Sequence, residues 1–572
     1  MGWIFSYLKP QRGRIALGLA IKITGTLSEL FIPFLMTHIL ENVIVTLDVS
    51  KIIFYGVIMA ICAVIAGVAN VTANRMAARV TMKFSSAMRR DLFSKTLDLS
   101  ASATDKFTIP SLEARITSDT YNVQNFVGMM QRMGVRAPIL LLGGIAITLI
   151  MDKYLALVMI ATLPLIFLVV YGISRKGVPL YTKVQKSVDG MVRVVREDAQ
   201  GIRVIKALSK NDYENRRYDE VNRALCRSEI RAGTIMGVVN PIMTMLMNLG
   251  IVAVVAVSAF LVSDGISSPA TVIAFMQYFT LISMAMMSIS RIFVSFTKCA
   301  ASANRISEVL FAENELKTEA DDGKGDPSKH ISFEGVSFSY FGKKANLEDI
   351  SFSLKRGESL GIIGATGSGK STLIKLLMRF YDVGEGCIRI NGRDLRSFER
   401  HELSAMFGVA LQNDFLYADT IEENIRFGRD ISDEDMIRAA KIAQAHDFIC
   451  AIPEGYSYKL SSKGTNLSGG QRQRLLISRA LAANPDILIL DDSSSALDYK
   501  TDAALRRALA ESMKDCTTVT VAQRVSSVKD CDLILVLDEG RIIGRGTHEE
   551  LMASCKEYKE ISDSQMGGAF LD

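Results

Sequence analysis

A glycine-rich segment in the second half of the chain combines residue types that bind phosphate. It reads GATGSGKST, and the residues expected at the phosphates are Gly364, Thr366, Gly367, Ser368, Gly369, Lys370, Ser371 and Thr372. The β-rich run 359–363 precedes it and the helical run 373–380 follows, which is the setting of a P-loop. In such a loop backbone N–H groups point at phosphate, Lys370 reaches the β- and γ-phosphates and Ser371 ligates Mg²⁺. The segment predicts a nucleotide site.

An acidic residue stands where it would complete that site. The apolar run 487–490 ends at Asp491. A carboxylate at the end of a buried strand, opposite a P-loop, holds Mg²⁺. The alternative is an Asp that caps the following helix, but the P-loop upstream favours the metal ligand.

A second glycine-containing segment lies between these two motifs. Leu467 is followed by Ser468, Gly469, Gly470 and Gln471, and then by a helical run. Small residues at a helix N-terminus let backbone N–H groups approach a phosphate closely. The chain therefore carries two segments able to bind anions.

The first 300 residues are very different in character. Six apolar stretches each cover the roughly 20 residues that span a bilayer; they are 15–45, 52–71, 134–151, 155–173, 234–262 and 271–296. The whole chain is 49% hydrophobic yet 22% charged, so a soluble part must lie beside the membrane part. The eight scattered cysteines form no CxxC pair and are expected to be reduced, and residues 1–10 do not have the layout of a cleaved signal peptide.

The connections between these stretches alternate in charge. Segments 41–51, 152–153 and 263–269 are short and almost free of Lys and Arg, whereas 75–136 and 175–210 are long and basic. The positive-inside rule puts the basic segments and both termini in the cytoplasm. Because apolar residues recur there at helical spacing, we expect membrane helices that continue tens of ångströms beyond the bilayer. The alternative, a basic helix on lipid or nucleic acid, is disfavoured because aromatic residues are not interleaved.

The composition changes again after residue 312. The polar segment 313–329 has no periodicity and is expected to be a linker between a transmembrane domain over 1–312 and a nucleotide-binding domain over 330–572. In the last domain β-rich runs alternate with helical runs, which is typical of an α/β fold.

With the Leu467–Gln471 pentapeptide between the P-loop and Asp491, and six apolar stretches ahead of them, the chain resembles the ATP-binding-cassette (ABC) exporter half-transporters over nearly its whole length. The resemblance implies an all-α six-helix transmembrane domain with long cytoplasmic helix extensions, followed by an α/β P-loop ATP-binding cassette. It also implies that two cassettes pair head to tail, so that ATP and Mg²⁺ lie between one chain's P-loop and the other chain's Ser468, Gly469, Gly470 and Gln471.

The same resemblance assigns further residues. Tyr340 matches an adenine-stacking aromatic residue, Gln412 matches a Mg²⁺ contact, and the loop 496–498 matches one that crosses the dimer interface. Segment 201–206 fits the family's second coupling loop. Around 107–110 a Pro-Ser pair replaces the usual glycine pattern, and Ser462 stands where exporters carry an acidic residue.

Two departures fall on this chain's own site. Asp492 replaces the Glu that orients the attacking water, and it is one methylene shorter; Gln523 replaces the switch histidine and cannot become cationic. A displacement of about 1 Å in a catalytic group costs roughly 100-fold in rate. The resemblance then points to the degenerate-site half of a heterodimer whose partner supplies the Glu and the His. A slow homodimer, or a chain engineered to trap ATP, is the alternative.

Features of the spans bear on the substrate. Glu29 lies in the first apolar stretch, where a carboxylate is costly unless it is paired or faces water. It either lines the translocation path and favours cationic substrates, or pairs with a Lys or Arg of a neighbouring helix. Methionines are frequent in the last two spans, and either line an adaptable cavity or pack between helices.

The resemblance implies ATP-driven export of amphipathic or hydrophobic small molecules, lipids or peptides by alternating access, and the short loops and fused layout indicate a bacterial plasma membrane. The rivals are a lipid flippase, an ATP-gated channel or regulator, and a soluble cassette ATPase on nucleic acid; the six apolar stretches oppose the last, and we expect no nucleic-acid partner.

Overall fold

The chain divides into two compact units. The computed structural model describes residues 2–313, 316–340, 342, 345–412, 414–493 and 495–567. One unit comprises Met1–Asp98 and Phe107–Ala312, and the other comprises Leu99–Lys106 and Glu313–Asp572. Positions 314–315 of the predicted linker and 568–572 of the predicted nucleotide-binding domain lie outside the described residues.

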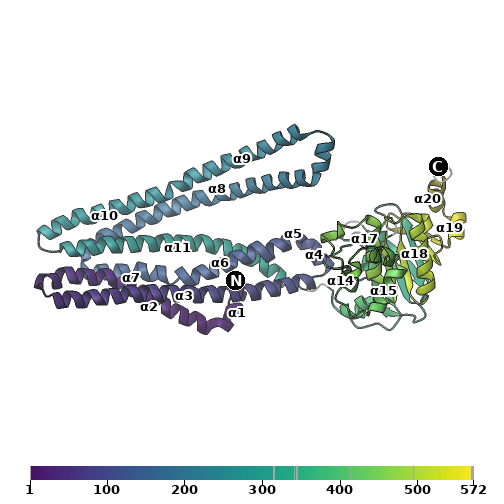
Figure 1. Cartoon of the computed structure of the whole chain (residues 1–572), viewed down its shortest axis with the longest axis horizontal. Helices are drawn as coiled ribbons and strands as arrows, with labels where there is room; N and C mark the ends of the chain where they lie inside the picture. Colours follow the sequence, from purple (N-terminus) through teal and green to yellow (C-terminus); the bar gives the residue numbers. More distant parts are fainter. Residues whose placement is uncertain are drawn as a thin grey trace. The chain divides into compact units, whose positions relative to one another are not determined.

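The first unit is built from helices alone (Figure 1). Its main helices are α1 (Gly2–Leu8), α2 (Arg12–His38), α3 (Val49–Asp98), α5 (Ile109–Ala114), α6 (Thr120–Met133), α7 (Arg136–Met151), α8 (Lys153–Ala207), α9 (Asn211–Gly237), α10 (Val239–Ser263) and α11 (Pro269–Leu310). Among the described residues, five helical segments are long and apolar enough to cross a membrane. The predicted stretch 155–173 lies within the single helix α8.

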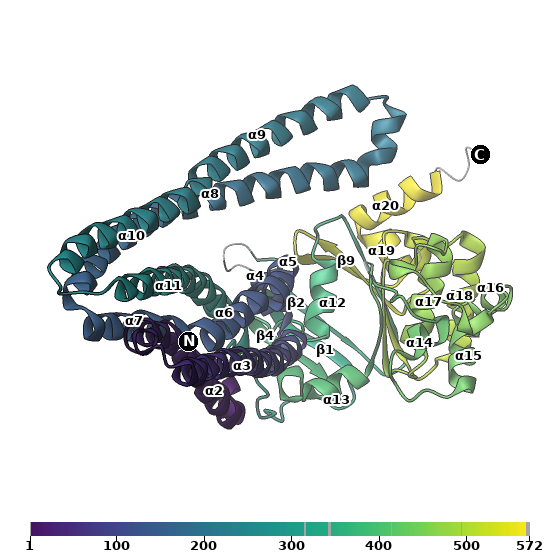
Figure 2. The ribbon, with the colours of Figure 1, turned by 60° about the vertical axis from the view of Figure 1, so that its left-hand side comes forward.

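Several of these helices are much longer than a bilayer is thick. α3 has 50 residues and α8 has 55 residues, which correspond to roughly 75 and 80 Å at 1.5 Å per residue. Both continue from an apolar segment into a basic one, and α8 and α9 run as a long hairpin (Figures 1 and 2). The predicted helix extensions beyond the spans are therefore present.

α2 and α3 approach each other closely at Gly25. A Cβ placed on Gly25 would lie 2.8 Å from the Cβ of Ala69, so a larger residue would force the two helices apart. One turn away, Lys22 donates from Nζ to Asn74 Oδ1 over 3.1 Å. Small residues and polar contacts of this kind hold membrane helices together.

Glu29 pairs with a cation of a neighbouring helix. Arg136 of α7 donates from Nη2 to both carboxylate oxygens of Glu29, at 2.7 and 3.0 Å, and from Nε to Oε2 at 3.3 Å. Of the two readings of Glu29, the structure has the ion pair. A carboxylate neutralised in this way has no free charge with which to attract a cationic substrate.

The second unit contains two sheets. Five strands of the larger sheet are parallel and the edge strand β10 is antiparallel, in the order β10 (Arg541–Gly546), β9 (Leu533–Asp538), β3 (Ser359–Gly364), β8 (Thr517–Val521), β7 (Ile487–Asp491) and β6 (Phe407–Ala410). The smaller sheet is antiparallel, in the order β2 (Leu347–Leu354), β1 (Ile331–Phe338), β4 (Glu385–Ile390) and β5 (Arg393–Asp394). The expected α/β fold is confirmed.

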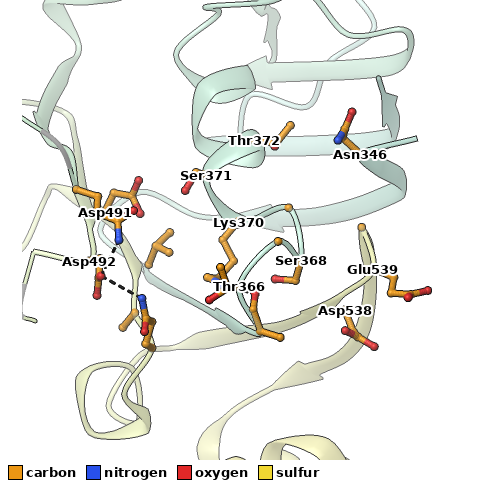
Figure 3. A pocket seen from close by; sticks show the side chains of 18 of the residues that line it. Asn346, Thr366, Ser368, Lys370, Ser371, Thr372, Asp491, Asp492, Asp538 and Glu539 are labelled. Atoms are coloured by element: carbon orange, nitrogen blue, oxygen red, sulfur yellow. Dashed lines mark hydrogen bonds between the residues drawn. The ribbon is translucent and has the colours of Figure 1, made fainter. Parts of the chain in front are cut away.

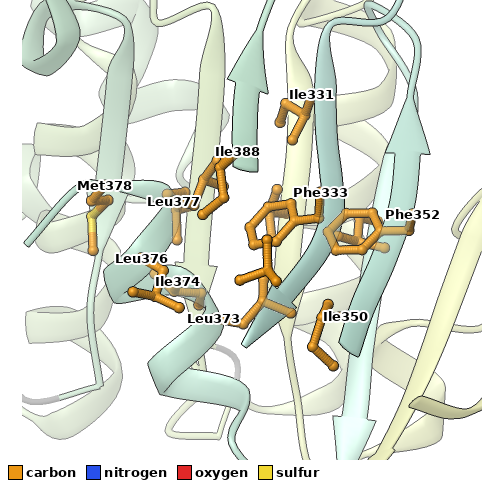
Figure 4. Packing of buried hydrophobic residues seen from close by; sticks show 14 of the residues in the cluster. Ile331, Phe333, Ile350, Phe352, Leu373, Ile374, Leu376, Leu377, Met378 and Ile388 are labelled. Atoms are coloured by element: carbon orange, nitrogen blue, oxygen red, sulfur yellow. The ribbon is translucent and has the colours of Figure 1, made fainter. Parts of the chain in front are cut away.

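One buried cluster of this unit lies around α12 (Lys370–Leu377) and the smaller sheet (Figure 4). Phe333 and Phe352, which face each other across β1 and β2, stack with ring centroids 4.6 Å apart. Leu373 and Ile374 of α12 are fully buried in the same cluster. Because Lys370 begins α12, this packing fixes the position of the P-loop.

Helices surround the larger sheet on the remaining sides. They are α13 (Arg400–Ala405), α14 (Ile421–Arg426), α15 (Asp433–Ile442), α16 (His446–Cys450), α17 (Gly469–Leu481), α18 (Tyr499–Ser512), α19 (His548–Ser554) and α20 (Lys556–Gly567). α4 (Ala101–Phe107) also belongs mostly to this unit, where Asp105 accepts a hydrogen bond from the hydroxyl of Tyr381.

Part of the predicted linker is bound to the cassette. Arg389 of β4, whose side chain is buried, donates from Nη1 and Nη2 to the two oxygens of Asp322, at 2.6 and 2.7 Å. Asp321 accepts a hydrogen bond from the backbone N–H of Asp394. Residues 321–322 are therefore held along β4 and β5.

Candidate functional site

A cavity of about 620 Å³ lies at the carboxyl ends of the parallel strands (Figure 3). Ligands of parallel α/β sheets bind at this edge, because the loops that leave the strands gather there. Its walls come from the loop between β3 and α12, from the ends of β6, β7 and β8, and from the turn between β9 and β10. The predicted residues among its lining are Thr366, Gly367, Ser368, Gly369, Lys370, Ser371, Thr372, Gln412, Asp491, Asp492 and Gln523.

The backbone of the P-loop explains its glycines. Gly367 and Gly369 have φ values of +87° and +104°, in the left-handed region that residues with a Cβ rarely adopt. A Cβ on Gly369 would also lie 2.7 Å from Leu347. Gly369 precedes the first turn of α12, so the N–H groups of that helix face the cavity and favour a phosphate.

Lys370 lies across this loop. Its Nζ donates to the carbonyl oxygens of Gly364 and Ala365, both at 2.8 Å. Burial lowers the pKa of Lys370, and the nearby carboxylates of Asp491 and Asp492 oppose that shift. A partly buried ammonium of this kind forms a strong charge-assisted hydrogen bond when a phosphate enters the cavity.

Asp491 is the buried carboxylate of the site. It ends β7, it is 6% exposed, and burial raises its pKa while a hydrogen bond with Ser371 lowers it. Carboxylate, hydroxyl and amide oxygens are the donors that Mg²⁺ prefers. Asp491, Ser371 and Gln412 all line the cavity and offer these donors, so they fit Mg²⁺, which would neutralise phosphate charge there.

Asp492 lies between two glutamines. Gln412 donates from Nε2 to Asp492 Oδ2 over 3.0 Å, and Gln523 donates from Nε2 to the same oxygen over 3.2 Å (Figure 3). Asp492 has a φ of +50°, and its N–H donates to the carbonyl of Val521. The two departures seen in the sequence therefore touch each other.

Gln565 of α20 is a residue that the sequence patterns did not single out. Its Nε2 donates to the carbonyl of Gln523, and its Oε1 accepts from the N–H of Val525, both over 2.8 Å. One side-chain amide thus holds the backbone on both sides of Arg524. A single glutamine near the end of a chain carries no spacing signal that would have found it.

The second anion-binding segment lies elsewhere. Ser468 caps α17, with its hydroxyl accepting from the N–H of Gln471 and the Gln471 side chain accepting from the N–H of Ser468. The residues described as lining the cavity include none from Ser468 to Gln471. A Cβ on Gly470 would lie 3.2 Å from the carbonyl oxygen of Ala496 in the predicted interface loop. The two segments predicted to bind phosphate therefore do not share this cavity.

Tyr340 lies beside the P-loop helix rather than in the wall of the cavity. Its hydroxyl is 3.4 Å from Thr372 Oγ1, and Lys375 Nζ lies 5.7 Å from its ring centre. With Tyr381 and Asp105 it lines a neighbouring cavity of about 530 Å³. Its role in stacking adenine stays a prediction.

Comparison with known proteins agrees with this architecture. Residues 15–286 match the ABC transporter transmembrane region, and residues 347–495 match the ABC transporter family. The chain is 35% identical to the ABC transporter ATP-binding protein YfiB of Bacillus subtilis over 98% of each chain. It is 30% identical to Rv1273c of Mycobacterium tuberculosis, over 98% of this chain and 97% of the relative.

Two further matches concern fold and possible cargo. A fatty acid ABC transporter ATP-binding/permease protein of Mycobacterium bovis is 32% identical over 83% of this chain and 75% of its own length. The structure of a bacterial Atm1-family ABC exporter with ATP bound superposes with a TM-score of 0.83 at 23% identity, covering 97% of this chain and 98% of that one. With its helical membrane unit fused to an ATP-binding cassette, the chain belongs to the ABC transporter family as a membrane-embedded half-transporter.

Proposed function

We propose that the chain is the degenerate-site half of a heterodimeric exporter that uses ATP to move amphipathic or hydrophobic small molecules, lipids or peptides. The observation that carries the proposal is the contact of Asp492 with Gln412 and Gln523. In this proposal ATP binds in the cavity through the P-loop residues from Thr366 to Thr372, with Mg²⁺ on Asp491, Ser371 and Gln412. Gly364 ends β3 next to this loop, and Tyr340 lines the neighbouring cavity.

The geometry at Asp492 supports slow hydrolysis at this chain's own site. A general base needs a lone pair directed at the attacking water. One oxygen of Asp492 already accepts two amide hydrogen bonds, and its side chain is one methylene shorter than Glu. Gln523 offers the γ-phosphate a neutral donor where a histidine would offer a cation. Asp492, Gln523 and Gln412 hold and shield the nucleotide more than they activate water.

The intact signature supports a working site on the partner. Ser468, Gly469, Gly470 and Gln471 retain a capped helix N-terminus that is exposed for another P-loop. The partner chain supplies its own P-loop, a catalytic Glu and a switch His, and this chain completes that site in trans. Hydrolysis then takes place mainly there.

The proposed transport cycle uses paired cassettes and the long helices that extend from the membrane spans into the cytoplasm. Closure of the cassettes on ATP, transmitted by the cytoplasmic helix extensions, opens the membrane unit outward, and hydrolysis resets it. The basic connections favour cytoplasmic termini. We infer that the spans lie in a bacterial plasma membrane, as the short loops and the fused layout suggest. The relative named for fatty acids favours an amphiphilic cargo.

ATP turnover of the purified chain, alone and co-expressed with a partner half-transporter in nanodiscs, tests the proposal. We expect turnover only in the complex, and we expect Ser468→Ala to abolish it. Fast turnover by the chain alone would mean that Asp492 and Gln523 suffice, and would reject the degenerate assignment. Accumulation of substrate against a gradient would separate an exporter from an ATP-gated channel or regulator.

A further inference from the structure

Four charged side chains gather where α2 meets the junction of α6 and α7. They are Lys22, Glu29, Arg132 and Arg136. Lys22 lies within electrostatic range of the other three. Three cations and one carboxylate leave the group with a net positive charge, which is costly among membrane helices.

The carboxylate serves only one of the three cations. Arg136 holds Glu29 through Nε and Nη2. Lys22, 4% exposed, donates to the amide of Asn74, and Arg132 donates from Nε to the backbone carbonyl of Gly128. Neither Lys22 nor Arg132 has a carboxylate oxygen of another described residue within 4.0 Å.

The group lies at the cytoplasmic end of the membrane segment of α7. α7 runs 16 residues from Arg136 to Met151, or about 24 Å, in a bilayer whose apolar core is about 30 Å thick. With the proposed orientation Arg136 is near the cytoplasmic edge of that core. An amphiphile held in the inner leaflet carries its polar head at this level.

Arg136 also faces an apolar space. It lines a small cavity of about 30 Å³ together with Ser288 and with Leu140, Leu281, Met284 and Ala285. Arg291, one turn from Ser288 on α11, donates to its hydroxyl over 3.4 Å. A cavity of this size holds about one water molecule, so it can take a polar atom of a charged head but not the hydrocarbon chain, which must lie outside it.

We propose that Arg136, with Lys22 and Arg132 beside it, binds the anionic head of a single-chain amphiphile, a carboxylate or phosphate, and that Glu29 is the counter-ion which this head displaces. The inference rests on the proposed transport function and gives it a substrate class. The tail leaves the small cavity along the exposed side chain of Met284 on α11. Glu29 neutralises Arg136 while no substrate is bound, so the empty transporter avoids part of the cost of uncompensated charge.

The test compares lipids that share one oleyl chain. Binding of oleate, oleoyl lysophosphatidate, oleyl alcohol and oleylamine to the complete transporter in neutral-lipid nanodiscs is measured without nucleotide. We expect the two anions to bind more tightly than the alcohol and the amine. Whichever anion binds more tightly identifies the head group, because the two separate a free fatty acid from a phospholipid.

Variants of the pair give opposite expected shifts. Glu29→Gln removes the competing carboxylate and should tighten anion binding about tenfold, whereas Arg136→Gln should weaken it about tenfold or more, as expected for a charge-assisted hydrogen bond. Oleyl alcohol should not respond to either change. Glu41→Gln, which removes a carboxylate bound to Thr271 at the other end of α2's membrane segment, is the matched control.

Two outcomes would overturn the inference. Equal losses for anion and alcohol in both variants would mean that the pair only holds α2 to α7, and the double variant Glu29→Gln, Arg136→Gln would then bind all four lipids alike. Tighter binding of oleylamine than of the two anions would mean that the site selects cationic rather than anionic head groups. ATP turnover is measured separately, so its absence would reject the proposed function while lipid binding remained readable.

Discussion

Gln523 donates a hydrogen bond from Nε2 to Oδ2 of Asp492 over 3.2 Å, and so joins the two positions at which this cassette departs from hydrolytic members of its family. Neither change is isolated, because the amide replaces a histidine at the same carboxylate that has lost a methylene. In the proposed function, a cavity built in this way binds nucleotide and orients water poorly.

Restoring both residues should restore hydrolysis. In the double variant Asp492→Glu, Gln523→His, we expect turnover at this chain's own site to rise by roughly 100-fold, because the carboxylate regains its reach. Turnover of the complex is measured with the partner's catalytic Glu replaced, so that only this site is read. Asp492→Asn is the control, and it should leave turnover at its low starting value. An unchanged rate in the double variant would place the defect elsewhere in the cavity.

Lys370 should dominate nucleotide affinity. Lys370→Met removes the partly buried ammonium from the P-loop, and we expect ATP to bind about 100-fold more weakly, since a hydrogen bond to a charged group contributes about 1.5–3 kcal/mol. The measurement is equilibrium binding of a fluorescent ATP analogue. Lys500→Met, on the exposed face of α18, is the matched control. Equal affinities in the two variants would contradict the site.

The clamp from α20 should order the loop that carries Gln523. Gln565→Leu removes two hydrogen bonds, each contributing about 1 kcal/mol. We expect the amide of Val525 to exchange with solvent roughly tenfold faster, as measured by hydrogen exchange with mass spectrometry. Ser564→Ala, on the neighbouring position, should leave the rate unchanged. Exchange that is identical in Gln565→Leu would show that the loop is ordered by the sheet alone.

His330 should make the cassette less stable in mild acid. Its ring is buried and its Nδ1 lies 2.6 Å from Thr517 Oγ1; burial lowers the pKa of His330, Arg356 lowers it further and Asp486 opposes them. A folded pKa below the unfolded value of about 6.5 means that the unfolded state binds the proton first. The contribution to stability is complete above pH 6.5 and is lost as the pH falls toward the folded pKa.

Thermal or denaturant unfolding of the full chain between pH 8 and pH 5 checks this expectation. The loss should be at most about 1.4 kcal/mol per pH unit, because a single proton is involved. His330→Gln should unfold with a shallower dependence on pH than the parent chain, whereas His401→Gln, at an exposed position, should follow the parent. Parallel curves for all three proteins would remove His330 as the cause.

Local motifs made the cassette's site predictable. The glycines, Lys370 and Asp491 were predictable from their spacing and from the strands and helix beside them. The structure brings them together with Gln412 and Gln523 in one cavity. Their roles in ATP chemistry remain predictions, but their position in one cavity could be predicted without the structure.

Helix extensions such as α3 could also be predicted, because apolar residues continue at helical spacing past the membrane span.

Contacts between distant parts of the chain were not predictable. Glu29 and Arg136 are 107 positions apart, so the sequence left the choice between pathway and ion pair open. The polar segment around Asp322 reads as a free linker, and only the buried guanidinium of Arg389 fixes it to a strand. Such pairings depend on tertiary packing, which no local pattern encodes.

The close contact at Gly25 has a mechanical consequence. Because Gly25 and Ala69 leave no room for relative sliding, and Lys22 is tied to Asn74, α2 and α3 form one stiff member of the membrane unit. If the membrane unit changes conformation during transport, its helices must separate at a contact other than that between α2 and α3. The contact of α2 with α7 is bridged by the ion pair of Glu29 and Arg136. A charged substrate that breaks this ion pair would allow these two helices to separate.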